Sequence, residues 1–383
     1  MMPDKPTIGL LPLYLKLYDD TWPSLRDAFA PFLETIRDAF ESEDCTVVTA
    51  SICRVAAEFC DAVKEFEAAD ADCIVTLHLA YSPSLEAIDA LLAWPRPIIM
   101  LDTTMDKSFG PDTAPDRIMF NHGIHGVQDL ANLLRRHGKR FTVVAGHVTE
   151  SELIWRASRM VRAARAARAF NSARVLRIGE TFAGMGDFAV PDDALAREFG
   201  ATVDTIDTLP LLHAVESVPE AGIDAELECD RGAYVVDAPD DVHRRSVRVG
   251  LGLRRLLDQG AYTAFTMNFL AFDESDGPLD NVPFLEASKA MARGLGYAGE
   301  GDALTAMLVG ALNTGFGTTT FTEMFCPNWR GGSIFLSHMG EINPTVAKDK
   351  AHIVEKDFPW TPARNPATMA CAPRQGSAVL ANL

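Results

Sequence analysis

The first 145 residues alternate short apolar runs with longer amphipathic stretches. Short apolar runs bounded by turn residues are typical of buried parallel strands, and amphipathic stretches between them are typical of crossover helices. The predicted strands are 8–11, 46–50, 73–77, 98–102 and 141–145, and the predicted helices are 22–40, 54–68, 83–93 and 126–137. This order predicts a doubly wound, flavodoxin-like α/β domain, whose ligands would sit beyond the carboxyl ends of the strands.

A second pattern of the same kind begins near residue 174. Its predicted strands are 174–179, 202–206 and 262–269, its predicted helices are 192–199, 242–259, 285–294 and 301–313, and the segment 273–283 is a predicted loop. From Gly315 onward the chain is rich in Gly, Thr, Pro and aromatic residues, with short apolar runs. We therefore expect an α/β protein with two doubly wound flavodoxin-like domains, 1–170 and 171–314, followed by the start of a β-rich C-terminal domain, 315–383.

Composition narrows the classes of protein to consider. A length of 383 residues exceeds what one hydrophobic core usually serves, so several domains are expected. The formal net charge of −18 argues against nucleic acid or an anionic membrane as a partner. The seven cysteines form no CxxC pair, which indicates reduced thiols, and no apolar run is long enough to span a bilayer. The prediction is a cytoplasmic protein.

Three side chains near the C-terminus could form an open divalent-metal site. Glu300 lies in a Gly-Glu-Gly-Asp run, Glu323 follows a Thr-rich turn, and His338 precedes Met-Gly-Glu. An ionised Glu in such an apolar, glycine-flanked setting would be costly to bury without a compensating cation or hydrogen bonds. The gaps of 23 and 15 residues are too long for one helix or hairpin turn, so the site would be assembled from separate elements. In the alternative reading, Glu300 only stabilises the start of the helix 301–313.

A basic stretch lies between residues 130 and 180, where Arg recurs at positions 156, 159, 162, 165 and 168. Three-residue spacing on a helix makes a slowly spiralling basic stripe. The stripe is interpreted as a solvated face or one that pairs with the acidic surface of another subunit. A phosphate or nucleic-acid contact is the alternative.

The same C-terminal segments resemble the L-arabinose isomerase and L-fucose isomerase superfamily, and the arabinose isomerase branch more closely. The run 296–302, Gly-Tyr-Ala-Gly-Glu-Gly-Asp, looks like that branch's first glutamate segment, and 336–341, Leu-Ser-His-Met-Gly-Glu, looks like its metal-histidine segment. Looser matches at 121–126, 177–180 and 260–269 follow in the family's order.

The resemblance implies a metal-dependent aldose–ketose isomerase that acts on an unphosphorylated pentose or deoxyhexose through a cis-enediol. It implies that Glu300 and Glu323 bind the metal and move protons, and that His338 is a further ligand. The implied cofactor is Mn²⁺, and Mg²⁺, Co²⁺ or Fe²⁺ would fit the same donors. It also implies a sugar as the small-molecule partner and a homo-oligomer, either a trimer or a hexamer.

Four further residues are implied to contact the substrate by their alignment with the family: His125, Asn121, Met185 and Phe269. His125 precedes Gly126 at the start of a predicted helix, so a plain helix-entry role is the alternative for it. His78 and His147 follow predicted strands and are candidates to line a crevice at the edge of the first sheet.

Two features differ from the family pattern. No Gln follows the first predicted strand in residues 11–18, which argues against L-arabinose as the substrate. The family's fourth metal ligand is a histidine near the end of a longer C-terminal domain, whereas His352 is the only histidine after His338. We therefore expect a truncated C-terminal domain and weak metal binding, and the alternative is a water or a carboxylate that completes the metal's ligands. The alternatives are a non-catalytic sugar-binding or regulatory protein on the same scaffold, or a metal-dependent lyase or epimerase that uses the same enediolate chemistry.

Overall fold

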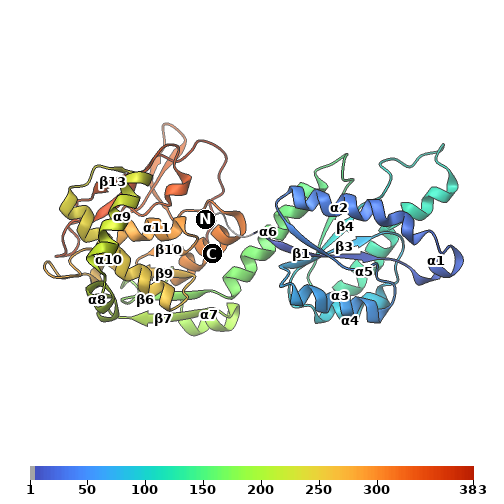
Figure 1. The fold of residues 1–383 in the computed structure, drawn as a ribbon, viewed down its shortest axis with the longest axis horizontal. Coiled ribbons are helices and arrows are strands. Elements are labelled where there is room, and N and C mark those ends of the chain that lie inside the picture. The colour runs from blue at the N-terminus through green and yellow to red at the C-terminus, as the bar shows by residue number, and fades with distance from the viewer. Residues whose placement is uncertain (1–4) are drawn as a thin grey trace. The chain divides into compact units, whose positions relative to one another are not determined.

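The computed structural model describes residues 5–383, which form two compact units with a boundary between Arg168 and Ala169. We call residues 5–168 the N-terminal unit and residues 169–383 the C-terminal unit, and each is described by itself (Figure 1). The expected division into three domains, 1–170, 171–314 and 315–383, stays a prediction. All seven cysteines are free thiols, and none of the helices among residues 5–383 is long and apolar enough to cross a membrane.

The N-terminal unit is a five-stranded parallel sheet in the order β2-β1-β3-β4-β5, which confirms the doubly wound, flavodoxin-like prediction. The strands are β1 (Thr7–Leu13), β2 (Thr46–Thr49), β3 (Cys73–His78), β4 (Ile98–Asp102) and β5 (Thr142–Ala145). The helices are α1 (Lys16–Thr21), α2 (Ala30–Ser42), α3 (Ala56–Ala68), α4 (Ser84–Ala93), α5 (Ile124–Arg136) and α6 (Leu153–Asn171), with 3₁₀ turns η1 (Arg26–Phe29) and η2 (Pro115–Phe120). One apolar core lies between the sheet and α2 and α6, and a second lies between the sheet and α3, α4 and α5.

The predicted single helix 22–40 is wrong at its start. The helix α1 ends at Thr21, before this segment, which instead contains a turn, the 3₁₀ turn η1 and then α2, which begins at Ala30. Pro31 explains the position of this start, because proline lacks a backbone N–H and is favoured in the first turn of an α-helix. The apolar period that suggested one helix continues through the turn into α2, where Phe32, Ile36 and Phe40 are buried.

The basic stripe of α6 is paired in part within its own unit, whereas Arg156 and Arg159 are exposed as a solvated face would be, and a subunit contact stays a prediction. Arg165 Nη1 lies 3.3 Å from Asp72 Oδ2, and Arg168 Nη2 lies 2.6 Å from Asp70 Oδ2. Arg162 donates to the carbonyl oxygen of Glu43 at 3.2 Å. The stripe therefore helps to fasten α6 to the loops that enter β2 and β3.

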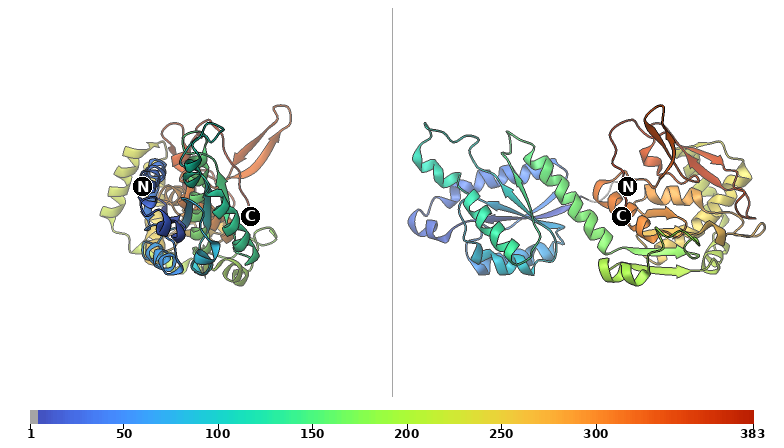
Figure 2. Two further views of the ribbon diagram at one scale, coloured as in Figure 1. Left: turned by 90° about the vertical axis from the view of Figure 1, so that its right-hand side faces the viewer. Right: turned by 180° about the vertical axis from the view of Figure 1, so that it is seen from behind.

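The C-terminal unit is built on a four-stranded parallel sheet in the order β7-β6-β9-β10, a second doubly wound arrangement (Figures 1 and 2). Its strands are β6 (Arg174–Ile178), β7 (Thr202–Ile206), β9 (Ala264–Met267) and β10 (Gly296–Gly299). The helices are α7 (Asp192–Phe199), α8 (Leu209–Glu216), α9 (Glu220–Ala233), α10 (Asp240–Gln259), α11 (Phe284–Ala292) and α12 (Ala303–Phe316), with the 3₁₀ turn η3 (Phe269–Ala271).

The last part of the chain is β-rich, as predicted. The strands β11 (Glu323–Asn328) and β12 (Ser333–Ser337) form an antiparallel hairpin. The strands β13 (His352–Glu355) and β14 (Ala367–Ala370) pair with the short β8 (Val235–Val236) in a three-stranded sheet, after the 3₁₀ turn η4 (Pro344–Val346). Because β8 precedes α10 in the chain, this region packs on the same unit as the parallel sheet, over a small apolar core with α9 and α10.

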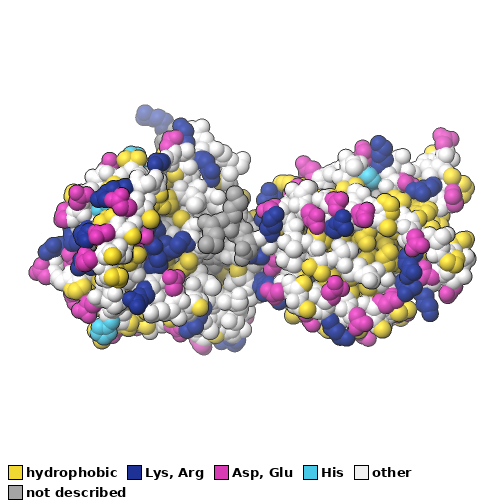
Figure 3. Space-filling model, viewed as in Figure 1, with side chains coloured by type: hydrophobic (Ala, Val, Ile, Leu, Met, Phe, Trp, Pro, Cys, Tyr) yellow, Lys and Arg dark blue, Asp and Glu magenta, His cyan; other side chains and the backbone are white. Residues whose placement is uncertain are grey.

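Buried charges between α9, α10 and α11 are fully paired. Arg254 bridges Glu226 at 2.7 Å and Glu286 at 2.9 Å, and Lys289 bridges Glu226 at 2.6 Å and Asp230 at 2.5 Å. Removing one member would leave an uncompensated buried charge, which is strongly destabilising. The network therefore fixes how α11, which leads directly into β10, lies against α10. On the outer face shown in Figure 3, acidic and basic side chains are interspersed.

We predict that Gly296→Ala destabilises the C-terminal unit by about 2 kcal/mol or more, the upper part of the range for overpacking. A Cβ at Gly296 would overlap the carbonyl oxygen of Ala306 and lie 2.6 Å from the amide nitrogen of Gly310, so α12 would have to move off β10. Thermal or urea unfolding followed by circular dichroism measures the change. Gly232→Ala is the control, since a Cβ there meets nothing within 4 Å and α9 should gain slightly in stability. Equal stability of the two variants would contradict the close packing of β10 on α12.

Candidate metal centre

The turn that carries Glu300 is held in a strained conformation at the carboxyl end of β10. Glu300 has φ = +64°, in the left-handed region that residues other than glycine rarely adopt. Its carbonyl oxygen accepts a hydrogen bond from the amide of Phe182 at 2.9 Å, and the amide of Gly301 donates to Thr266 Oγ1 at 3.1 Å. Such strain persists only where the surroundings enforce it, and it clusters at functional sites.

The glycines on both sides of Glu300 are required by close approach. A Cβ at Gly299 would lie 2.8 Å from Cε1 of His338, so the imidazole packs directly on the turn. Gly301 has φ = +87°, and a Cβ there would lie 2.6 Å from the Cα of Thr181. Side chains at either position would push the Glu300 turn away from its neighbours.

Glu323 and His338 reach the same place from the base of the hairpin. Glu323 is the first residue of β11 and pairs with Ser337, the last residue of β12, so His338 follows directly beside it. The Nε2 atom of His338 lies 3.8 Å from Oε1 of Glu323. One ligand atom from each of Glu300, Glu323 and His338 can be chosen so that all three lie within 4.8 Å of one another.

The three donors fit a divalent cation. Ligand atoms bound to one ion at about 2.1 Å lie at most about 4.2 Å apart, so a small adjustment would close the set. The Glu323 side chain is 42% exposed and can make this movement without disturbing the core. Two carboxylates and one imidazole suit Mn²⁺ and neighbouring divalent ions.

A buried carboxylate orients the imidazole. Glu341, whose side chain is fully buried, lies with Oε2 2.9 Å from Nδ1 of His338, and its Oε1 accepts a hydrogen bond from the hydroxyl of Tyr297 at 2.7 Å. A carboxylate partner favours the proton on Nδ1, which leaves the lone pair of Nε2 directed to Glu323 and Glu300. Tyr297 belongs to β10, so the same strand positions both the Glu300 turn and the histidine.

The electrostatics of the cluster favour a cation. Burial raises the pKa of Glu300, and the nearby carboxylates of Glu323 and Glu341 raise it further, against the opposing effect of His338. For His338, burial lowers the pKa, but Glu341, Glu323 and Glu300 together outweigh burial and the net pKa is raised. Burial also raises the pKa of Tyr297 well above its ordinary value. Three carboxyl groups around one imidazole thus concentrate negative charge where the donors converge.

Aromatic side chains form an apolar wall beside these donors. Phe321 contacts His338 edge to face, with ring centroids 4.8 Å apart. Phe269, in η3 after β9, has its ring 5.7 Å from that of Phe182, whose amide binds the Glu300 carbonyl. Met185 is 41% exposed in the loop after β6, and its amide donates to the Phe182 carbonyl oxygen at 3.4 Å. Phe269 and Met185 thus belong to the loops around the Glu300 turn, and their contact with substrate stays a prediction.

His125 and Asn121 lie on the N-terminal unit. His125 is exposed in the first turn of α5, with its ring centroid 6.2 Å from that of His122. The side-chain amide of Asn121 donates to Asp106 Oδ2 at 2.8 Å and to the Arg117 carbonyl oxygen at 2.9 Å, so it holds the loop before α5. Because the two units are described separately, a shared site between these residues and Glu300 stays a prediction.

The two other histidines of the N-terminal sheet edge differ in their surroundings. His78 ends β3 and is buried against Gly126, where burial lowers its pKa to about 3. The imidazole is therefore a neutral core side chain and not part of an open crevice wall. His147 is partly accessible, and its Nδ1 accepts a hydrogen bond from the amide of Thr149 at 3.2 Å. Its ring caps the turn that follows β5.

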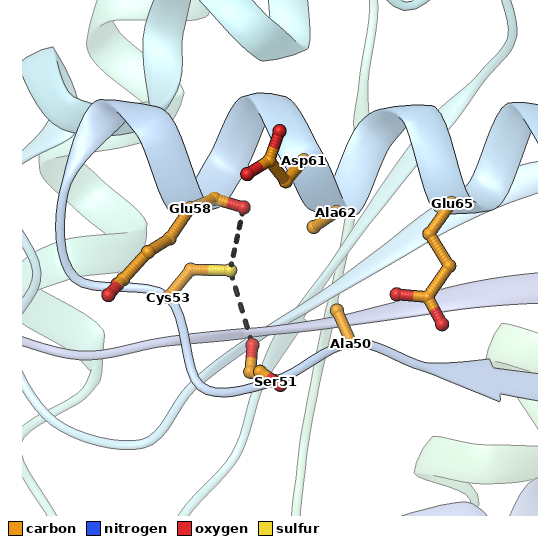
Figure 4. A pocket seen from close by; sticks show the side chains of 7 residues that line it. All are labelled: Ala50, Ser51, Cys53, Glu58, Asp61, Ala62 and Glu65. Atoms are coloured by element: carbon orange, nitrogen blue, oxygen red, sulfur yellow. Dashed lines mark hydrogen bonds between the residues drawn. The ribbon is translucent and has the colours of Figure 1, made fainter.

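A shallow pocket on the N-terminal unit lies between the end of β2 and α3 (Figure 4). Cys53 Sγ donates to the carbonyl oxygens of Ser51 and Glu58, and the carboxylates of Glu58 and Glu65 lie at opposite ends of the pocket. Among residues 5–383, Glu300, Glu323 and His338 are the group of three or more side chains that converges as a metal site would require. The pocket therefore offers no comparable centre.

Sequence reasoning did not assign a role to Glu341 or Tyr297. Glu341 follows His338 by three residues, and a carboxylate this close to a candidate metal histidine is a usable signal for an orienting partner. Tyr297 gives no such signal, because its contact with Glu341 joins residues 44 positions apart.

Comparison with known proteins matches the part of the chain that carries this centre. Residues 174–315 match the family model described as the L-arabinose isomerase central domain. The L-arabinose isomerase of Salmonella arizonae is 28% identical over 328 residues, which cover 81% of this chain and 64% of that protein. The enzyme of Nocardioides sp. is 29% identical over 317 residues, which cover 79% of this chain and 62% of that protein. The chain thus spans less than two thirds of the length of these relatives.

Among the solved structures matched is the sugar-binding protein of a sugar ABC transporter from Bacillus halodurans, with 13% identity and a TM-score of 0.19 over 86% of this chain and 96% of that one. A likeness this slight carries no argument about fold or function. The central-domain match covers residues 174–315, and the relatives align over about four fifths of the chain. The chain is thus similar to L-arabinose isomerases along most of its length.

Proposed function

We propose that this protein is a metal-dependent aldose–ketose isomerase that acts on an unphosphorylated pentose or deoxyhexose. The observation that carries the proposal is the convergence of Glu300, Glu323 and His338 within 4.8 Å, from three separate elements. The buried Glu341 behind the imidazole supports it, because orienting a histidine through its second nitrogen is typical of metal sites. The similarity to L-arabinose isomerases supports the reaction type.

The reaction moves a carbonyl group from C1 to C2 of the sugar. A base removes the proton from C2 while the C1 oxygen gains a proton, which gives a cis-enediol, and a proton returned to C1 with loss of the O2 proton gives the ketose. Glu300 and Glu323 approach the centre from different elements, so one carboxylate can take the proton and either can return it. A bound divalent cation would stabilise negative charge on the sugar oxygens as a Lewis acid.

The surroundings of the centre favour a neutral sugar over a phosphorylated one. Arg177 lies against the Glu300 turn, where its Nε donates to the Gly301 carbonyl oxygen at 3.3 Å. Its guanidinium is paired with Asp192 at 2.8 Å and is buried, so it is committed to holding the turn. A phosphate group on the substrate would need an arginine or lysine side chain that is free to bind it, and Arg177 is not. The aromatic wall of Phe321 suits the apolar face of an uncharged sugar.

Ketose formation from L-arabinose, D-arabinose, L-fucose and D-galactose tests the proposal directly. The protein is dialysed against Mn²⁺ and assayed beside a sample treated with a chelator. We expect metal-dependent formation of one ketose. Metal and sugar binding without any product would favour a non-catalytic sugar-binding protein, and an epimer or cleavage fragments would favour the epimerase or lyase alternative. The native metal, a homo-oligomeric trimer or hexamer, and a cytoplasmic location stay predictions.

We predict that Glu300→Gln lowers kcat by about 10²–10⁴-fold, the range that general acid–base catalysis supplies. The amide has nearly the shape of the carboxylate but cannot accept the proton, and the strained turn is held by backbone contacts that remain. Initial rates and circular dichroism give the two readouts. Glu216→Gln, at an exposed position of α8, is the control and should leave the rate unchanged. Unchanged turnover of Glu300→Gln would remove this residue from the proton transfer.

We predict that Glu341→Gln lowers Mn²⁺ affinity by about 10–100-fold, as is typical when the partner of a metal histidine is changed. The neutral amide no longer holds the proton on Nδ1 of His338, so the Nε2 lone pair is less well directed. His338→Ala should lower the affinity further, because it removes the ligand itself. Loss of the free-ion signal in electron paramagnetic resonance measures binding, and His213→Ala, at an exposed position of α8, is the control. Equal affinity in Glu341→Gln and the unaltered protein would show that this carboxylate does not position the histidine.

A further inference from the structure

The turn from Gly299 to Asp302 reverses the chain through two residues with positive φ. Glu300 has φ = +64° and Gly301 has φ = +87°, and the amide of Asp302 donates to the carbonyl oxygen of Gly299 at 3.1 Å. Turns with positive φ at both central positions are dominated by Asn, Asp and Gly, because longer side chains disfavour that backbone conformation. Glu300 therefore stands against a local preference, and contacts from outside the turn must hold it.

A row of polar residues crosses the parallel sheet next to this turn. Thr205 on β7 pairs with Arg177 on β6, Arg177 pairs with Thr266 on β9, and Thr266 pairs with Ala298 on β10. Residues in register on parallel strands point to the same face of the sheet, so Arg177 and Thr266 share a face. Thr266 is fully buried and Arg177 is 6% exposed. Buried parallel strands usually carry apolar residues at such positions, so this row needs a reason.

Thr266 ties together the two ends of the segment that carries Glu300. Its Oγ1 donates to the carbonyl oxygen of Ala298 at 2.8 Å and accepts a hydrogen bond from the amide of Gly301 at 3.1 Å. The carbonyl oxygen of Gly299 lies 3.2 Å from the same Oγ1, so either carbonyl group before Glu300 can accept the hydroxyl hydrogen. One side chain thus links the backbone before Glu300 to the backbone after it.

Arg177 binds the remaining polar backbone group of Gly301. Its Nε donates to the Gly301 carbonyl oxygen at 3.3 Å, while its Nη1 donates to Thr205 Oγ1 at 3.1 Å and its Nη2 pairs with Asp192 at 2.8 Å. The amide of Gly301 is bound by Thr266, so both of its backbone groups are fixed by the polar row. The direction in which the Glu300 side chain leaves the turn follows from this fixed backbone.

We propose that Thr266, supported by Arg177, is a positioning residue that directs the Glu300 carboxylate toward Glu323 and His338. Its hydroxyl acts through the backbone of the turn, so it is not a catalytic residue. Residues that orient metal ligands from behind commonly matter for metal affinity, because the ligand atoms must be held close to one geometry. The effect on metal binding rests on the proposed function, whereas the hold of Thr266 on the turn does not.

Thr266→Val tests the hold on the turn, because valine keeps the branched shape and the strand propensity of threonine but lacks the hydroxyl. Hydrogen–deuterium exchange of the amides of residues 299–302 is measured by mass spectrometry in the metal-free protein. We expect exchange to be about fivefold faster or more, the effect of losing one hydrogen bond. Thr266→Ser keeps the hydroxyl and should restore slow exchange. Circular dichroism reports whether each variant is folded.

Mn²⁺ affinity, measured by electron paramagnetic resonance, tests whether the hold on the turn positions Glu300. Thr266→Val should lower the affinity by about tenfold or more, and Thr266→Ser should stay close to the unaltered protein. In a Glu300→Ala background, Thr266→Val should cause no further loss, because the hydroxyl acts on the metal only through Glu300. A further loss of the same size in that background would overturn the proposal.

The matched control is Thr76→Val, at a fully buried position of β3 where Oγ1 has no hydrogen-bond partner among residues 5–383. It should change neither the exchange of residues 299–302 nor the Mn²⁺ affinity. Unchanged exchange in Thr266→Val, or faster exchange with unchanged affinity, would overturn the proposal. If the unaltered protein bound no Mn²⁺, the proposed function would fail, and the exchange data would still decide whether Thr266 holds the turn.

Discussion

The hydrogen bond between His338 and the buried carboxylate of Glu341 is the contact on which the candidate centre depends. It fixes the ring position and leaves one nitrogen free for the other donors. Because Glu341 also accepts from Tyr297, the orientation of the histidine is tied to β10, the strand that ends at Glu300. A shift of the sheet would therefore move all the donors together, which keeps their geometry constant.

The scaffold concentrates strain and close packing at the same end of the parallel sheet. Glu300 adopts a left-handed backbone between two glycines, and each glycine admits a neighbour that a side chain would exclude. The paired charges around Arg254 and the contact of Gly296 with α12 fix the elements on either side of β10. The site thus follows the rule that ligands of doubly wound sheets lie at the carboxyl ends of strands. Its novelty is that a hairpin from the β-rich region supplies the remaining donors.

That hairpin combines two properties that conflict in an isolated chain. Its base holds Glu323 and His338 in register, which requires a stable pair of strands. Its length beyond the base exposes apolar side chains, which is unfavourable in water.

The sequence by itself predicted both doubly wound sheets and named the three candidate donor residues that the structure brings together. The alternation of apolar runs with amphipathic stretches indicates which residues are buried, and therefore predicts the strands and helices. A glutamate flanked by glycines in an apolar run indicates a polar group at a special position. The helix α2 begins at Ala30 because Pro31 favours the first turn of a helix. Arg165 and Arg168 of α6 pair with Asp72 and Asp70 inside the N-terminal unit. Only the tertiary structure showed that Tyr297 and Glu341 meet behind His338, since contacts between residues distant in sequence leave no periodic signal in the chain.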